Sequence, residues 1–400
     1  MSAVPRESAV LEARRRLRAS RGRRGDRPLQ APARPPLRVV DVALFYGERS
    51  GGIRTYIDAK AAWAQASGLI EHHIVVPGPA ERHADGRHEL PSLRLAATNG
   101  YRMPIGARAL RATLRDLRPH VVVLHDPFWR PLRVTRTAHE LGAKVVAVHH
   151  GSTALDAAGM PGPDALWHPL LRAWMHHAYA DADAVMSAVD PRADCGRDAV
   201  LPLRFGLDPA FVPQRDVRRQ DHVLYVGRLG REKGVIELLH AAARSSEPWQ
   251  LKLVGRGPIE ERVRRLAERL GIADRVRLYP FISERRRLAR WYASARVVVM
   301  PGAYETFGLV GFEAAASGAS VVTCSTAPSA ALMRGIVRTY EPGDIDGLLA
   351  AIEAARAAQP DAAAAAALAK RCSWGAAFAA ETQQLERLAA PRRRPRVVAT

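Results

Sequence analysis

The sequence predicts an α/β protein built from two Rossmann-like, doubly wound lobes that face each other across a cleft. Short apolar runs alternate with helix-compatible stretches from Leu37 to about residue 370. This alternation stops once, between Pro202 and Gln220, and then restarts. Alternating strands and helices predict right-handed βαβ units and a parallel sheet, and 400 residues are long for one hydrophobic core.

The first lobe is expected to cover residues 37–204, behind a basic tail at 1–36 that carries at most a short helix at 8–19. Buried parallel strands read as apolar, β-branched runs, and helices show apolar residues at three- and four-residue spacing. The predicted strands are Val39–Phe45, Ile74–Val76, Val121–Leu124, Val145–Val148, Ala184–Ser187 and Val200–Leu203, and the predicted helices are 52–67, 107–118, 132–141 and 165–180.

The second lobe is expected to cover residues 221–372, after an interlobe linker at 205–220. A further amphipathic helix is predicted at 373–390, before a basic tail at 391–400. The predicted strands of this lobe are Val223–Val226, Leu251–Val254, Val276–Phe281, Val297–Met300 and Ser320–Thr323, and its predicted helices are 233–244, 258–270, 283–294, the second half of 300–318, and 344–370.

The composition limits the possible partners and the compartment. The formal net charge is +20, but arginine supplies nearly all of the positive charge, and no nucleic-acid-binding motif accompanies it. We therefore expect no nucleic-acid partner, and expect instead that a basic face is attracted to anionic lipid at the inner side of a membrane. No apolar run is long enough to predict a membrane span, no secretory signal is recognisable, and three widely spaced cysteines suit a reducing cytoplasm.

The stretch from Met300 to Gly318 is the most informative part of the sequence. It reads as the end of a buried strand, a turn and the start of a helix. Backbone N–H groups near Gly308 and Leu309 would be unpaired at the helix start, where the helix dipole favours a phosphate. Glu305 in the turn and Glu313 on the helix are suited to accept hydrogen bonds from sugar or ribose hydroxyls.

This Glu-x7-Glu pattern, with Phe307 and Gly308 inside it, resembles the donor-site signature of the family 4 glycosyltransferases, which have the GT-B fold. The resemblance covers residues 37–389 and is strongest from 222 to 323. It implies that Glu305 contacts the donor sugar, that Glu313 contacts the ribose, and that Phe307, Gly308 and Leu309 line the donor site. It also implies that the terminal helix, entered at Ser373 and Trp374, crosses back to the first lobe.

A second motif opens the second lobe at Val226 to Gly234, directly after a predicted strand. Arg228 and Lys233 are five residues apart across a glycine-bearing turn, a spacing that directs both cations at one diphosphate and stabilises the departing charge. The alternative is a solvated basic turn. The motif resembles the diphosphate clamp of the same family, and the resemblance also places Gly255 and Phe281 around the nucleotide.

The first lobe offers a glycine pair and three histidines near predicted strand ends. Gly51 and Gly52 follow the first strand, His125 ends another, and His149 and His150 end the next. Strand ends at the carboxyl edge of an open α/β sheet are where ligands bind, although a lone histidine there is often structural. The resemblance places Gly51 and Gly52 at the donor diphosphate, His150 at the reacting centre, and His125 and His149 on the acceptor side.

These expectations combine into a retaining glycosyltransferase that moves a hexose from a UDP- or GDP-sugar to a lipid-linked or polysaccharide acceptor. In the same-face mechanism usual for this family the departing phosphate takes the acceptor proton, so Glu305 orients the sugar and no protein nucleophile is needed. No cofactor or metal is expected. A GT-B sugar phosphorylase, a dinucleotide-dependent oxidoreductase and a catalytically silent binding protein remain alternatives, although no proper dinucleotide fingerprint is present.

The chain departs from the family pattern in the linker, in the central stretch and after His125, where Asp126 replaces the family's glutamate. The linker reads Arg204-Phe205-Gly206-Leu207-Asp208, which keeps only the Gly and the Asp of the family's linker motif. Gly302 stands where the family usually has a serine. The first departure concerns hinge or acceptor details, and the second has little consequence for the expected donor site.

Overall fold

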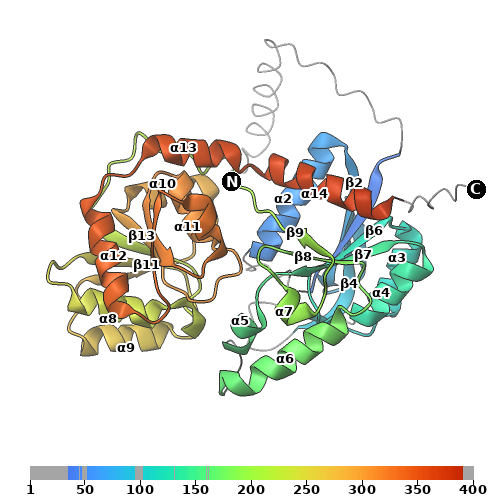
Figure 1. Ribbon diagram of the computed structural model, residues 1–400, viewed down its shortest axis with the longest axis horizontal. Coiled ribbons are helices and arrows are strands. Elements are labelled where there is room, and N and C mark those ends of the chain that lie inside the picture. Colours follow the sequence, from blue (N-terminus) through green and yellow to red (C-terminus); the bar gives the residue numbers. More distant parts are fainter. Residues whose placement is uncertain are drawn as a thin grey trace, which may run out of the picture. The chain divides into compact units, whose positions relative to one another are not determined.

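The computed structural model describes residues 35–44, 46, 52–94, 102–129, 131–158, 160 and 162–390. It contains two largely parallel sheets, each covered by helices, which confirms the predicted α/β class (Figure 1). The predicted helix at 8–19 and the predicted site residue Gly51 lie outside the described residues. Within the described part of the chain, no helix is both long and apolar enough to cross a lipid bilayer.

The first sheet is centred on β1 (Leu37–Val42), which pairs in parallel with β2 (Ile70–Gly78) on one side and β6 (Val121–Leu124) on the other. Its full order is β3-β4-β2-β1-β6-β7-β8-β9, and β5 pairs with β4. The remaining strands are β3 (Arg82–Ala84), β4 (Arg87–Arg94), β5 (Arg102–Pro104), β7 (Lys144–His149), β8 (Ala184–Ser187) and β9 (Val200–Pro202).

Helices cover both faces of this sheet because successive side chains of β1 point to opposite sides. Val39 packs in the same core cluster as residues of α2 (Gly52–Ser67), whereas Val40 and Val42 pack with residues of α3 (Arg108–Leu117) and α4 (Pro131–Glu140). Asp41 therefore shares the α2 face with Val39. The lobe also contains α5 (Thr153–Ala158), α6 (Asp164–Ala178) and α7 (Arg192–Cys195).

The second sheet is entirely parallel, in the order β12-β11-β10-β13-β14-β15. One group of helices, α8, α9 and α12, packs together, and α10, α11 and α13 form another (Figure 1). The strands are β10 (His222–Val226), β11 (Gln250–Val254), β12 (Val276–Tyr279), β13 (Val297–Met300), β14 (Ser320–Cys324) and β15 (Val337–Tyr340). The helices are η1 (Arg231–Lys233), α8 (Val235–Arg244), α9 (Glu260–Arg269), α10 (Arg285–Ser294), α11 (Leu309–Ala316), η2 (Pro328–Met333), α12 (Ile345–Ala357) and α13 (Ala362–Arg371).

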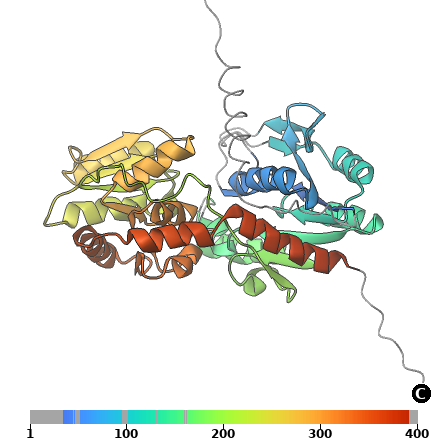
Figure 2. The ribbon, with the colours of Figure 1, turned by 90° about the horizontal axis from the view of Figure 1, so that it is seen from above.

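The last helix, α14 (Trp374–Ala389), packs on α2 of the first lobe, as the resemblance implies (Figures 1 and 2). Ser373 caps its first turn by accepting a hydrogen bond from the N–H of Ala376. Phe378 lies against Tyr56 of α2, with ring centroids 5.3 Å apart. Gly206 passes so close to Trp374 that a Cβ atom would overlap the Trp374 backbone, which gives one reason for glycine at that linker position.

The structure differs from the predicted elements in several places. The predicted helix at 344–370 is two helices, because Pro360 interrupts the pattern and Asp361 caps α13. The strands β3, β4, β5 and β15 were not predicted, since their sequences lack the continuous apolar run of a central strand. The first strand ends at Val42 rather than at Phe45, and Phe45 lies outside the described residues.

Candidate functional site

The candidate site of the second lobe lies where the strand order reverses. β10 is followed in the sheet by β11 on one side and by β13 on the other, and ligands of open α/β sheets bind outside the carboxyl ends of the strands at such a switch point. The turns after β10 and β13 meet there, because a Cβ atom at Gly234 would overlap the Pro301 carbonyl oxygen. Gly234 has a φ of +68°, in the left-handed region that favours glycine.

This meeting of turns brings together two of the predicted site residues. Lys233 Nζ donates a hydrogen bond to Glu305 Oε1 over 2.9 Å. Their side chains are 23% and 14% exposed, so the pair is partly shielded but open to a ligand. Arg228, on the same turn as Lys233, pairs instead with Glu232, and its side chain is 45% exposed.

Two helices begin beside this pair, and no side chain caps either of them. α8 starts after Gly234, and α11 starts after Gly308, which has a φ of +90°. The first N–H groups of a helix have no partner within the helix, and they point along the positive end of its dipole. The arrangement is suited to an anion such as a phosphate.

Glu313 lies on α11 and is buried, with 7% of its surface exposed. Tyr292 donates a hydrogen bond to Glu313 Oε2 over 3.1 Å, and Arg285 Nη1 donates to Oε1 over 3.3 Å. Burial raises the pKa of Glu313 to about 7, although Arg285 and Tyr292 oppose the rise. Arg285 also donates to Thr55 Oγ1 of α2 over 3.0 Å.

The remaining predicted donor-site residues differ in exposure and in what they contact. Phe281 is 70% exposed, whereas Phe307 is only 5% exposed and packs on Phe205 with centroids 4.4 Å apart. A Cβ atom at Gly255 would overlap the Gly227 carbonyl oxygen, so the close packing of the two backbones accounts for glycine at this position. Gly52 begins α2, and a Cβ atom there would lie 3.3 Å from Leu309 Cδ1.

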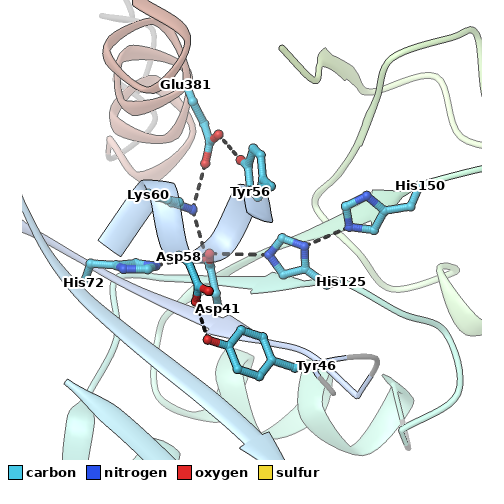
Figure 3. A network of polar contacts seen from close by, with 9 residues as sticks. All are labelled: Asp41, Tyr46, Tyr56, Asp58, Lys60, His72, His125, His150 and Glu381. Carbon is cyan, nitrogen blue, oxygen red and sulfur yellow. Dashed lines mark hydrogen bonds and ion pairs between the residues drawn. The ribbon is translucent and has the colours of Figure 1, made fainter. Parts of the chain in front are cut away.

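The first lobe also has a switch point, between β1 and β6, and two predicted histidines meet near it. His125 follows β6, and His150 follows β7. His125 Nδ1 lies 2.9 Å from His150 Nε2, and the two rings face each other edge to edge, with planes 18° apart and centroids 5.1 Å apart (Figure 3). Burial lowers the pKa of His150 well below its ordinary value, and the neighbouring His125 and His149 add to this effect.

Behind these histidines lies a buried ionic network that the sequence reasoning did not identify (Figure 3). Its centre is Asp41 of β1, with Lys60 Nζ 2.9 Å from Oδ1 and His125 Nε2 3.4 Å from Oδ2. Lys60 Nζ also lies 2.8 Å from Glu381 Oε1 of α14. One signal was available, because Asp41 is a charged residue inside an apolar strand and Lys60 is one of only five lysines.

His149 is directed at a different partner from His150. Its Nε2 atom lies 3.3 Å from Asp194 Oδ2, and Asp194 also accepts two hydrogen bonds from Thr153. Asp126, which follows His125, accepts hydrogen bonds from the backbone N–H groups of Leu44, Phe128 and Trp129, and so holds two loops together. The contacts of His149 with Asp194 and of Asp126 with the three N–H groups hold neighbouring loops in place. The assignment of His149 to the acceptor side stays a prediction.

The described residues contain no group of three or more His, Cys, Asp or Glu side chains arranged to hold a metal ion. A cavity of about 550 Å³ opens at the amino-terminal edge of the second sheet, away from Lys233. Arg219, Arg296 and Arg356 line it, and each already donates to a backbone carbonyl or a carboxylate. The cavity therefore offers no strong reason to assign a ligand.

Comparison with known protein families gives two matches that together span both lobes. The family model described as "Glycosyl transferases group 1" matches residues 213–365. The family model described as "Glycosyltransferase Family 4" matches residues 50–188. Lys233, Glu305 and Glu313 fall within the first match, and His125 and His150 within the second.

Two curated bacterial proteins are similar over most of their length. A GDP-mannose-dependent alpha-(1-6)-phosphatidylinositol dimannoside mannosyltransferase from Mycobacterium tuberculosis is 32% identical over 314 residues, covering 72% of this chain and 80% of the relative. D-inositol 3-phosphate glycosyltransferase 2 from Catenulispora acidiphila is 35% identical over 342 residues, covering 76% and 75%.

Solved structures share the fold at lower sequence identity. Sucrose-phosphate synthase from Thermosynechococcus elongatus has a TM-score of 0.70 at 18% identity, covering 88% of this chain and 99% of that structure. HepE of Anabaena in complex with UDP and glucose has a TM-score of 0.67 at 15% identity, covering 88% and 100%. At these identities the likeness concerns the fold alone.

Proposed function

The chain belongs to the family 4 glycosyltransferases of the GT-B fold, and from this premise we propose that it is a retaining hexosyltransferase. The proposed donor is a GDP- or UDP-sugar, and the proposed acceptor is a lipid-linked glycan or a polysaccharide. No metal or cofactor takes part in the proposed reaction.

The observation that carries the proposal is the contact between Lys233 and Glu305 at the switch point of the second sheet. The ammonium group is a compact charge for the diphosphate, next to two uncapped helix starts that favour phosphate. The carboxylate beside it is an acceptor for the hydroxyls of the attached sugar. One turn thus supplies a group for the leaving diphosphate, and the facing turn supplies a group for the sugar.

In the proposed transfer the bond between the anomeric carbon and the diphosphate oxygen breaks, and a bond to the acceptor oxygen forms on the same face. The acceptor proton passes to the departing phosphate oxygen, so no protein nucleophile is required. Lys233 and Arg228 stabilise the charge that develops on the diphosphate, since fixed cations next to a developing charge act in the transition state. Gly52 and His150 are assigned to the donor diphosphate and the reacting centre, and Phe281 to the base.

The donor proposed first for testing is GDP-mannose, because the Mycobacterium tuberculosis relative is GDP-mannose-dependent at 32% identity. That relative acts on a phosphatidylinositol dimannoside, which supports a lipid-linked acceptor. Leu166, Leu170 and Trp174 recur at four-residue spacing on α6 and are exposed, which supports peripheral contact with a membrane. The proposed location is the inner face of that membrane.

A binding panel followed by a transfer assay tests the proposal. The full chain is heated with GDP-mannose, UDP-glucose and ADP-glucose, and a donor at a hundred times its Kd raises stability by about 2.7 kcal/mol. The stabilising donor is then incubated with a phosphatidylinositol mannoside, and the anomeric configuration of the product is read by NMR. Inversion would refute the retaining mechanism. Activity only with inorganic phosphate and a sugar 1-phosphate would identify a phosphorylase instead.

A further inference from the structure

We propose that Asp41 is a positioning residue for His150 and acts through His125. In this arrangement His150 carries its proton on Nε2 and presents the lone pair of Nδ1. The inference rests on the proposed function, which places His150 at the reacting centre. It adds a buried carboxylate on β1 that controls which nitrogen of His150 faces the substrate.

The geometry is a line of contacts from the carboxylate to the histidine (Figure 3). His125 Nε2 faces Asp41 Oδ2 at 3.4 Å, and the opposite nitrogen of the same ring, Nδ1, faces His150 Nε2 at 2.9 Å. Asp41 and His125 are buried, with exposed fractions of 0% and 2%. Water therefore does not compete for these contacts, and the partners on the two sides of the His125 ring decide where its protons lie.

Asp41 has a counter-charge that keeps it ionised despite its burial. Burial alone would raise the pKa of Asp41, but the adjacent Lys60 ammonium, together with the buried histidines, holds it well below its usual range. Lys60 in turn is fixed between Asp41 and Glu381, and these two carboxylates raise the pKa of Lys60 against the effect of burial. The acceptor next to His125 is therefore an anion at neutral pH.

An anion beside Nε2 of His125 favours the tautomer with the proton on that nitrogen. When the His125 ring carries this one proton, its Nδ1 is an acceptor, and it receives the Nε2–H of His150. The neutral His150 ring has only one proton to place, so its Nδ1 is left with a lone pair. Among the described residues no donor occupies that lone pair. It is available to accept a hydrogen bond from a hydroxyl of the donor sugar or of the acceptor.

The alternative is that the network only stabilises the fold and has no effect on the tautomer of His150. His72 allows the two roles to be told apart. Its Nε2 lies 3.1 Å from the same oxygen, Asp41 Oδ2. His72 belongs to β2, whereas His125 follows β6, on the other side of β1. Like His125 it is buried, with a side chain that is 2% exposed. His72 and His125 thus share a partner and an environment, but only His125 touches His150.

The direct test is the protonation state of His150 in the wild-type chain, read from the ¹⁵N shifts of its two ring nitrogens. His150→Gln identifies the signals by removing them. We expect Nε2 to be protonated and Nδ1 to be bare at neutral pH. Finding the proton on Nδ1 overturns the proposal whatever reaction the enzyme catalyses, so this result is independent of the proposed function.

The kinetic test compares Asp41→Asn, His125→Gln and His72→Gln in the transfer assay. The Asn amide donates to His125 Nε2 and reverses both tautomers, so we expect kcat to fall on the order of 100-fold while the donor KM stays within about threefold. We expect a similar loss for His125→Gln, and a kcat within about threefold of wild type for His72→Gln.

Equal losses in His125→Gln and His72→Gln would overturn the proposal in favour of a structural network. If Asp41→Asn fails to fold, His125→Gln and the wild-type spectrum still decide the question. If no nucleotide sugar is a donor, the proposed function fails, while the spectrum still shows whether Asp41 sets the tautomer of His150. The two failures are therefore distinguishable.

Discussion

Lys233 places an ammonium group beside the Glu305 carboxylate, at the start of α8. If this charge stabilises the departing diphosphate, its removal acts on the transition state more than on the bound donor. We predict that Lys233→Ala lowers kcat roughly 100- to 1,000-fold in the transfer assay, because one charged transition-state contact has an effect of this size. The thermal unfolding of the variant should stay close to that of wild type, since the Lys233 side chain is only partly buried, with 23% of its surface exposed.

Arg231 is the matched control for this prediction. It is a cation on the same turn, two residues before Lys233, and it is exposed. Arg231→Ala should change kcat no more than about twofold, because a solvated surface charge contributes little. Equal losses in both variants would show that the net charge of the turn matters and that Lys233 has no special position.

We expect Glu313 to couple donor binding to pH, since burial raises its pKa to about 7. An acid with a raised folded pKa binds its proton more tightly in the folded chain, so wild-type stability falls as pH rises from about 4.5 to about 7. A rise from the ordinary 4.5 to about 7 corresponds to roughly 3 kcal/mol. We predict that Glu313→Gln, which removes this titration, gains stability relative to wild type over that interval.

Urea unfolding at pH 5, 6, 7 and 8 measures this difference, and the donor Kd is followed over the same range. Wild-type donor binding should strengthen as Glu313 ionises and becomes a hydrogen-bond acceptor for the ribose, whereas the variant should bind weakly at every pH. Glu341, which is exposed, provides the control Glu341→Gln, with no change expected in either quantity. A parallel pH dependence in wild type and Glu313→Gln would remove Glu313 from both roles.

At the scale of elements, the turn between β10 and α8 depends on Gly234. Its φ is +68°, and a Cβ atom would overlap the Pro301 carbonyl oxygen of the neighbouring turn. Gly234→Ala must therefore separate the turns that carry Lys233 and Glu305. We predict a loss of at least about 3 kcal/mol in the free energy of unfolding, from left-handed strain combined with steric overlap.

Gly271 separates these two causes. Its φ is +66°, nearly the same as that of Gly234, but a Cβ atom there would meet nothing within 4 Å. Gly271→Ala should therefore cost only about 1–2 kcal/mol in urea unfolding, the strain of the backbone conformation alone. Equal losses at the two positions would mean that the two turns do not need their close approach.

The sequence predicts the central strands well, because a parallel strand buried on both faces is a continuous apolar run such as Val121–Leu124 or Val297–Met300. It does not predict β4, the strand next to the edge of the first sheet, because its sequence mixes charged residues with Pro91 and lacks a continuous apolar run. The contact of Lys233 with Glu305 can be predicted from the sequence, since both residues follow strands that end at one edge of a sheet. The complete network around Asp41 cannot be predicted in this way, because Glu381, which pairs with Lys60, lies on α14, which follows both lobes in the sequence.

At the scale of the whole molecule, Lys60 joins the first described strand, β1, to the last described helix, α14. It pairs with Asp41 of β1 at 2.9 Å and with Glu381 of α14 at 2.8 Å, and all three side chains are at most 6% exposed. Tyr56 donates a further hydrogen bond to Glu381 (Figure 3). A buried charge without a partner destabilises a protein strongly, so this triad ties the position of α14 to the sheet.

We predict that Lys60→Met lowers the free energy of unfolding by about 3–5 kcal/mol at pH 7, since it leaves two buried carboxylates without a counter-charge. In wild type, Lys60 holds the pKa of Asp41 in the folded chain below its value in the unfolded chain. The stability that the ionised Asp41 contributes is fully present above its pKa in the unfolded chain, and it is lost as pH falls through its pKa in the folded chain. In the variant the carboxylates gain stability by protonation as pH falls. The difference between the two proteins should therefore shrink towards acidic pH.

The exposed pair Arg244–Asp346, whose side chains are 50% and 81% exposed, gives the matched control. Arg244→Met removes a cation of similar length from a solvated ion pair, so it should change the free energy of unfolding by less than about 1 kcal/mol. Hydrogen exchange adds a local measurement, because an unpaired Glu381 should speed exchange in 374–389 in Lys60→Met and leave it unchanged in Arg244→Met. If α14 keeps its protection in Lys60→Met, the aromatic contacts of Tyr56 with Phe378 and Trp374, rather than the ionic triad, hold the terminal helix on the first lobe.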